Sequence, residues 1–231
     1  MNPRLILSLF PGIGLLDQAF EEAGFSVVRG PDLLWGGDIE RFHSPPGVFE
    51  GVIGGPPCQA FSTASAFGGA NHKVDLIPEF MRVVSEASPS WVVMENVIGA
   101  LHHPVIFDDW HSTILRDWDC GGHTNRRRVF WTWPFFMLAP TKRPGIPSRS
   151  VIASTAKQGG ADSKYGQKRG FLEGNLPLAE YARLQGAESI TARLEQLNAS
   201  KRFIVHVLGN GVPLAMGRHV AAAAKQFSES M

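Results

Sequence analysis

Residues 5–24 constrain the fold of this chain more than any other stretch. Residues 5–10 form a short apolar run, a turn with Gly12 and Gly14 interrupts it, and apolar residues then recur at helical spacing until Gly24. A strand, a glycine turn and a helix in this order open the doubly wound α/β folds, whose turn cradles a nucleotide-type cofactor at the helix N-terminus. Such turns are common, so the ligand needs support from elsewhere. The prediction is an α/β fold with residues 5–10 as its first, central strand.

Strand and helix patterns continue along the chain. Apolar runs predict further strands at residues 25–28, 51–53, 91–94 and 126–133, and helical spacing predicts helices over 76–84, 178–186, 190–197 and from about 214 to 227. Residues 104–118 also show helical spacing, with Ile106, Trp110, Ile114 and Leu115 as the expected core positions. Residues 134–147 hold four prolines and little periodicity, which predicts a loop or linker.

Length and composition favour one principal soluble domain. A chain of 231 residues suits a single α/β domain. No apolar run reaches membrane-spanning length and no leader signature opens the chain, so we expect a cytoplasmic protein without a membrane segment. With only Cys58 and Cys120, a thiol role is a more natural interpretation than a disulfide framework. His102, His103 and His111 complete no ligand pattern, and no metal is predicted.

Two chemically capable residues follow neighbouring buried strands. Cys58 lies in a Gly-Gly-Pro-Pro-Cys turn directly after residues 51–53, and Glu95 ends the run at 91–94. Because open α/β sheets bind ligands beyond the carboxyl ends of their strands, both side chains are expected on one rim. A lone cysteine is more often a small buried hydrophobe, so Cys58 is a nucleophile candidate only together with Glu95. Residues 62–75 are rich in Gly, Ala, Ser and Asn, which suggests a lid over this rim.

Two acids follow the second predicted strand. Asp32 stands where such folds commonly place a carboxylate on a ribose, although a surface turn acid explains it equally well. Asp38 is placed to accept from an amino group such as that of adenine. The interval between them is too short for a helix, so we expect one layer of the fold to be trimmed there.

Positive charge is concentrated in one part of the chain. Between Arg126 and Arg169 there are ten Lys or Arg residues and one acid, although the net charge of the chain is only +1. A segment of this kind is the usual footprint of a phosphate-backbone partner, with a solvated loop as the alternative. Alternate residues of a strand share a face, so Arg126 and Arg128 can act together while Arg127 points away.

Motifs in a fixed order over nearly the full length resemble those of the DNA (cytosine-5) methyltransferase family. The matching segments are 10–14 with 21–25, 37–39, 55–62, 95–97, 126–130, 178–186 and 209–213. The resemblance implies a Rossmann-like class I methyltransferase sheet with helices on both faces. It also implies S-adenosyl-L-methionine as cofactor, S-adenosyl-L-homocysteine as product and double-stranded DNA as partner, in a restriction-modification or phage-like prokaryotic context.

The same resemblance assigns roles to individual residues. The implied catalytic residues are Cys58, Glu95, Arg126 and Arg128. The implied cofactor contacts are Phe10, Gly12, Ile13, Gly14, Leu15, Asp32, Asp38, Ile39, Pro57, Asn210, Gly211 and Val212. Gln59, Ser62, Asn96 and Val97 are implied to meet the substrate. Cys58 would add to C6 of a flipped cytosine, Glu95 would stabilise the developing charge, and C5 would then take the methyl group.

The chain departs from the family in its recognition region. Members usually carry a sizeable domain between the Arg-x-Arg strand and the 178–186 helix, where this chain has only a short segment. The expected organisation is a methyltransferase core at 1–133, a short basic recognition or linker segment at 134–175, and residues 176–231 completing the core. Specificity is then expected to be short or relaxed, or supplied by a protein partner or oligomer. Thr124 stands where the family has Gln. An RNA-directed enzyme and a non-catalytic DNA-binding relative are the alternatives.

Overall fold

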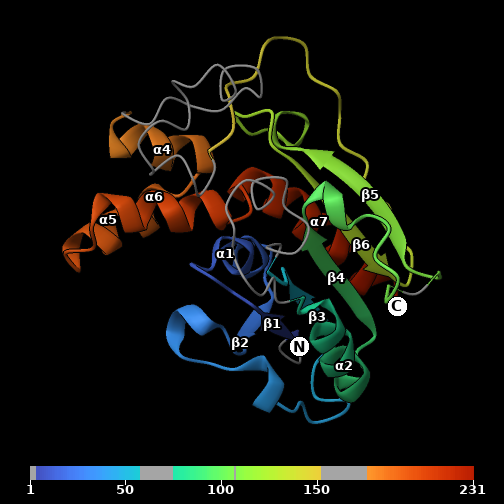
Figure 1. The fold of residues 1–231 in the computed structure, drawn as a ribbon. Coiled ribbons are helices and arrows are strands. Elements are labelled where there is room, and N and C mark those ends of the chain that lie inside the picture. The colour runs from blue at the N-terminus through green and yellow to red at the C-terminus, as the bar shows by residue number, and fades with distance from the viewer. Residues whose placement is uncertain (1–3, 58–74, 107, 152–175) are drawn as a thin grey trace.

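A computed structural model describes residues 4–57, 75–106, 108–151 and 176–231. Within these ranges the chain forms a six-stranded sheet in the order β2-β1-β3-β4-β6-β5 (Figure 1). The strands are β1 (Leu5–Leu9), β2 (Ser26–Arg29), β3 (Gly51–Gly54), β4 (Trp91–Asn96), β5 (His111–Arg116) and β6 (Arg127–Trp133). The first four run parallel, and β6 lies antiparallel between β4 and β5.

Helices cover both faces of this sheet. They are α1 (Leu15–Glu22), α2 (Ile77–Ala87), α4 (Leu178–Gln185), α5 (Glu188–Gln196), α6 (Lys201–Asn210) and α7 (Leu214–Ser230). Successive strand residues alternate between two separate cores: Ile6 and Ile53 pack in the core with α1 and α7, whereas Leu7 and Val52 pack in the core with α2. This alternation is the doubly wound α/β arrangement that the sequence predicts.

The strand order reverses direction beside β1. The chain passes from β1 to β2 on one side and then returns to place β3 on the other side of β1. In open α/β sheets this switch point is where the loops after adjacent strands separate and leave a ligand crevice. The loops after β1 and β3 are those that carry Gly12, Gly14 and the Gly-Pro-Pro turn before Cys58.

The region between Asp32 and Asp38 is trimmed as expected. It contains the short 3-10 turn η1 (Leu33–Trp35) and is followed by η2 (Ile39–Arg41), with no α-helix between β2 and β3. The sheet therefore ends at β2 on this side, and η1 and η2 lead the chain around that edge.

The helix predicted over 104–118 is wrong. Residues 111–116 form β5, which pairs with β6 along its whole length, from His111 opposite Thr132 to Arg116 opposite Arg127. Trp110 and Leu115 are buried as predicted, but Ile114 is 41% exposed because β5 is an edge strand with one open face. Hydrogen bonding to β6 overrides a short apolar pattern that fits either period.

The apolar residues Ile204, Val205, Val207 and Leu208 lie in helix α6 and are buried in the core. Residues 62–74 of the expected lid lie outside the described residues. In the described part of the chain, no helix has the length and apolar character needed to span a membrane.

Candidate active site

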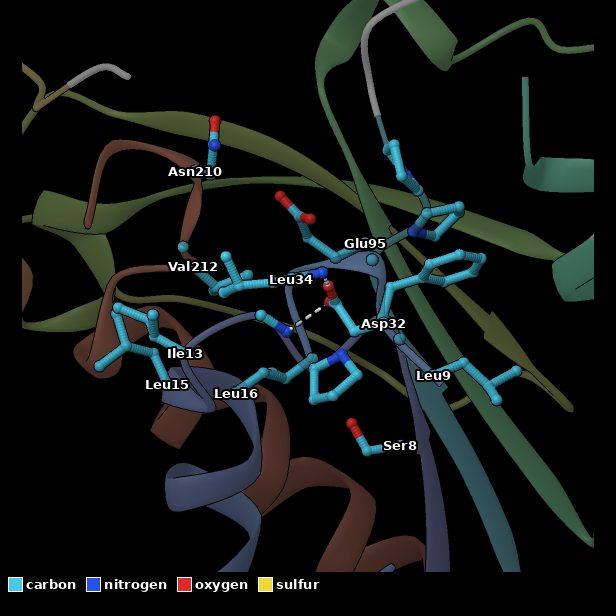
Figure 2. Close-up of a pocket in the computed structure, with 18 of the residues that line it drawn as sticks. Ser8, Leu9, Ile13, Leu15, Leu16, Asp32, Leu34, Glu95, Asn210 and Val212 are labelled. Atoms are coloured by element: carbon cyan, nitrogen blue, oxygen red, sulfur yellow. Dashed lines mark hydrogen bonds between the residues drawn. The ribbon is translucent and has the colours of Figure 1, made fainter. Parts of the chain in front are cut away.

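A cavity of about 270 Å³ lies at the switch point of the sheet. Figure 2 shows side chains converging on it from β1, the glycine turn, the loop after β2, the end of β4 and the end of α6. The predicted site residues in its lining are Phe10, Gly12, Ile13, Leu15, Asp32, Pro57, Glu95, Asn96, Val97, Arg128, Asn210, Gly211 and Val212. Gly14, Asp38, Ile39 and Arg126 do not line it, and Cys58, Gln59 and Ser62 lie outside the described residues.

The turn after β1 has a backbone that only a glycine-rich sequence adopts easily. Gly12 and Gly14 have φ values of +56° and +80°, and Gly14 is the N-cap of α1. Phe10 also has a positive φ of +56°, which costs a non-glycine residue roughly 1–2 kcal/mol. Strained backbone of this kind gathers at ligand sites, and here it turns the chain around the cavity.

Asp32 ties this turn to the loop after β2. Its carboxylate accepts hydrogen bonds from the backbone N–H of Gly12 at 2.8 Å and of Leu34 at 2.7 Å (Figure 2). The indole N–H of Trp35 donates to the Gly12 carbonyl at 2.7 Å. Asp32 thus lines the cavity and also stabilises the conformation of the glycine turn after β1.

Asp38 and Ile39 belong to the turn η2, outside the cavity lining. The Asp38 carboxylate caps η2 by accepting from the N–H of Glu40 at 3.0 Å, and the Ile39 side chain is buried. Arg82 on α2 donates to the carbonyls of Ile39 and Phe42 and so holds this turn in place.

The sequence did not point to a buried acid in the wall of the cavity. Asp17, in the first turn of α1, is fully buried and accepts from the Ser8 hydroxyl at 2.5 Å and from Nε of Arg29 at 2.9 Å. Burial raises the pKa of the Asp17 carboxyl despite these partners. A polar residue inside an apolar strand was the only signal: Ser8 stands within the run 5–10.

Glu95 projects from the end of β4 into the cavity (Figure 2). Its side chain is 10% exposed, and Oε1 forms an ion pair with Nε of Arg128 at 2.6 Å. Burial raises the pKa of Glu95, and the charges of Arg128 and Arg126 oppose the rise. The net effect is a raised pKa, so this carboxyl holds a proton more readily than an exposed glutamate does.

The Gly-Pro-Pro turn is held directly beside Glu95. The Asn96 side-chain amide donates to the Pro56 carbonyl at 3.2 Å, while its oxygen accepts from the Val97 N–H at 2.8 Å. A Cβ placed on Gly55 would lie 2.9 Å from Oε2 of Glu95, so only glycine leaves this oxygen its space. These contacts fix the chain up to Pro57, the residue before Cys58.

Arg126 lies behind the cavity. It is 3% exposed, and its guanidinium donates to the Val151 carbonyl and, at 2.7 Å, to the Gly209 carbonyl. The residue two places before it, Thr124, is buried and donates its hydroxyl to Asp117 at 2.7 Å. Thr124 therefore serves the turn between β5 and β6.

The thiol of the second cysteine, Cys120, has low reactivity. Burial and the nearby carboxylates Asp117 and Asp119 raise the pKa of the Cys120 thiol to about 12. Thiolates are the reactive form, so Cys120 is unsuited to nucleophilic attack near neutral pH. Among the described residues, no three His, Cys, Asp or Glu side chains are grouped as a metal site requires.

Solved structures of methyltransferases share this fold. The Entamoeba histolytica methyltransferase EhMeth superimposes with a TM-score of 0.62 at 12% identity, covering 100% of both chains. The S. pombe Dnmt2 methyltransferase superimposes with a TM-score of 0.61 at 14% identity, covering 98% of both chains. The fold is thus that of the Rossmann-like class I methyltransferases.

Sequence comparisons narrow the class to one family. The family model of the C-5 cytosine-specific DNA methylases matches residues 36–132. Type II methyltransferase M.HgiGI of Herpetosiphon aurantiacus is 30% identical over 116 residues, which cover 39% of this chain and 88% of that protein. Type II methyltransferase M.NgoPII of Neisseria gonorrhoeae is 32% identical over 162 residues, which cover 56% of this chain and 48% of that protein. The chain belongs to the C-5 cytosine-specific DNA methylase family, and it spans about half or less of M.NgoPII, M.FnuDI and M.DdeI.

Proposed function

We propose that this protein is a DNA (cytosine-5) methyltransferase that uses S-adenosyl-L-methionine and forms a covalent adduct through Cys58. The observation that carries the proposal is the buried Glu95, paired with Arg128 in the wall of the cavity and placed beside the turn that leads to Cys58. Membership of the family supports the same reaction.

The cavity suits S-adenosyl-L-methionine. Its walls combine apolar side chains, such as those of Leu9, Ile13 and Val212, with the carboxylates of Asp32 and Glu95. The glycine turn lies at the N-terminus of α1, where α/β folds bind nucleotide-type ligands, and Gly12 and Ile13 line the cavity. When bound, the cofactor supplies an electrophilic methyl group. The residues proposed to hold it are the predicted cofactor contacts that line the cavity: Phe10, Gly12, Ile13, Leu15, Asp32, Pro57, Asn210, Gly211 and Val212. Asp38 and Ile39, in the turn η2, are proposed to meet its adenine.

Glu95 and Arg128 act on the cytosine ring in this proposal. Glu95 is proposed to donate a proton to N3 of the flipped base, and its raised pKa favours this role. Arg128 stabilises the carboxylate that remains, through the contact it already makes at 2.6 Å. Protonation at N3 withdraws electrons from C6 and so makes that carbon open to attack.

Cys58 supplies the electron pair for that attack. Its thiolate sulfur bonds to C6 as N3 takes the proton of Glu95, the ring becomes nucleophilic at C5, and C5 takes the methyl group with S-adenosyl-L-homocysteine as the leaving group. Loss of the C5 proton to a base then restores the double bond between C5 and C6 and breaks the bond from sulfur to carbon, so that Cys58 is released as thiolate and N3 returns its proton to the Glu95 carboxylate. Asn96 assists by holding Pro56 and thereby the start of the Cys58 loop.

DNA is proposed to lie against the basic segment. In the described residues 134–151 there is no helix or strand beyond isolated bridge residues at Ser148 and Ser150, so this part offers little surface for reading a major groove. Phosphate contacts from exposed residues such as Arg127 and Lys142 bind without sequence information. We therefore expect short or relaxed specificity, with residues 134–175 as a recognition or linker segment or with a partner supplying recognition.

Transfer of tritium from labelled cofactor to mixed-sequence DNA tests the function. Wild type should label DNA, Cys58→Ala should not, and Cys120→Ser should label like wild type. DNA with 5-fluorocytosine should trap an adduct that survives denaturant, because the fluorine cannot leave as the proton does. Label on structured RNA in preference to duplex DNA would instead identify an RNA-directed enzyme. No label and no adduct would leave a non-catalytic DNA-binding relative.

A further inference from the structure

We propose that Arg126 is a positioning residue: together with Gln185 it holds the C-terminal turn of α6 against the cofactor cavity. The turn carries Asn210, Gly211 and Val212, which line the cavity, whereas Arg126 does not. The inference rests on the proposed function only for the identity of the ligand.

The end of α6 needs side-chain donors. A helix leaves its last four carbonyls without partners inside the helix, and many helices solve this with a left-handed glycine. Here Gly211 is extended, with φ of −67° and ψ of 154°, and its N–H reaches only the Val207 carbonyl at 3.1 Å. The next two carbonyls, of Leu208 and Gly209, are free for donors from elsewhere in the chain.

Two buried side chains supply those donors. Nε2 of Gln185, from the end of α4, donates to the Leu208 carbonyl and, at 3.4 Å, to the Gly211 carbonyl. The Arg126 guanidinium donates to the Gly209 carbonyl at 2.7 Å. Gln185 is 1% exposed and Arg126 is 3% exposed, so water does not compete for these carbonyls.

The positive charge of Arg126 suits this place. A helix C-terminus carries partial negative charge, and a cation bonded to it is stabilised more when both are buried. The second amino group of the guanidinium donates to the Val151 carbonyl, so one side chain joins the residue before β6, the backbone at Val151 and the end of α6. Arg128, two residues along, is instead part of the cavity wall and contacts Glu95.

The two arginines therefore have different tasks. Arg128 acts at the reacting base, and Arg126 acts through Asn210, Gly211 and Val212 on the cofactor. Without Arg126 the turn samples other conformations, and the apparent Kd rises in proportion to the lost population of the binding-competent one. A turn that is competent one-tenth of the time gives a tenfold higher Kd, which corresponds to about 1.4 kcal/mol.

Titration calorimetry of the full chain with S-adenosyl-L-homocysteine, without DNA, tests the proposal. Arg126→Met and Gln185→Met should each raise Kd about tenfold, and Arg126→Lys should raise it less. The double variant should show less than the product of the single effects, because both side chains hold one turn. Arg202→Met, at an exposed arginine in the first turn of α6, is the matched control and should bind the cofactor like wild type.

Steady-state kinetics separate positioning from chemistry. In Arg126→Met the KM for cofactor should rise about tenfold while kcat at saturating cofactor falls less than threefold. Wild-type Kd together with a large loss of kcat would overturn the proposal and place Arg126 at the base. If Arg126→Met does not fold, Arg126→Lys and Gln185→Met decide, and failure of all three to fold would assign the pair to global stability. A wild-type chain that binds no cofactor would refute the proposed function itself.

Discussion

Gly55→Ala should slow methyl transfer without unfolding the protein. A Cβ at this position would lie 2.9 Å from Oε2 of Glu95, about 0.5 Å inside the ordinary contact limit of about 3.4 Å. The φ of Gly55 is not in the left-handed region, so the backbone accepts alanine. The Glu95 side chain must therefore give way, although its other oxygen is held by Arg128 at 2.6 Å.

The size of the effect follows from that displacement. A misplacement of about 1 Å in a catalytic group can cost about a hundredfold in rate, so a shift of half that distance should cost about tenfold in kcat. Stability should change by less than about 1 kcal/mol, because alanine lowers the entropy of the unfolded chain by a similar amount. That corresponds to a Tm shift of only about 2–4 °C.

Single-turnover methylation and thermal unfolding measure the two quantities. Gly217→Ala is the control, because a Cβ there would meet Ala19 Cβ at 3.0 Å between α1 and α7, outside the cavity lining. This control should change Tm and keep kcat. An unchanged kcat in Gly55→Ala would show that the position of the Glu95 carboxylate does not limit the reaction, and the assignment of Glu95 as proton donor would be wrong.

Three further predictions follow from the buried and bonded groups. Since the folded pKa of Glu95 lies above its ordinary value of 4.5, the folded state holds this proton more tightly. Stability should therefore decrease as pH rises from about 4.5 through the raised pKa, and urea unfolding of Glu95→Gln should lack this part of the decrease. With a pKa of about 12, Cys120 should resist iodoacetamide at pH 8 while Cys58 is alkylated, as read by peptide mass spectrometry. Asp32→Asn places an amide where a carboxylate accepts from Gly12, so the KM for cofactor should rise about tenfold, and an unchanged KM would contradict this role.

The sequence predicts well those elements that have both a clear apolar periodicity and glycine or proline residues at their ends. The β1, turn and α1 unit has an apolar run, two glycines and a helical stripe, and its helix bounds are close to those expected. Glu95 follows from its position at the end of an apolar run, because such ends meet at one edge of a parallel sheet. No glycine or proline separates β5 from the residues just before it, and β5 is stabilised by pairing with β6, which lies later in the chain. Periodicity alone therefore predicted a helix where the structure has a strand.

The task of Arg126 depends on contacts that no local pattern encodes. Alternation along a strand correctly separates Arg127, which is exposed, from Arg126 and Arg128. It does not reveal that Arg126 meets Gly209, which is 83 residues away in the sequence. The contact forms because the Gly209 carbonyl, at the end of α6, needs a hydrogen-bond donor. Only the three-dimensional structure shows that the end of α6 lies beside Arg126.

Two buried acids, Asp17 and Glu95, line the cavity and each pairs with an arginine, but their hydrogen bonding differs. Burial raises the pKa of both Asp17 and Glu95. Each oxygen of Asp17 accepts a hydrogen bond, from Ser8 and from Arg29, so this acid holds β1 and α1 together. Oε1 of Glu95 has the charge of Arg128 at 2.6 Å but lacks a well-aligned hydrogen bond there. A buried acid whose hydrogen-bonding capacity is not fully used inside the protein can bond to a ligand. For this reason we place the reacting base at Glu95 and treat Asp17 as part of the frame.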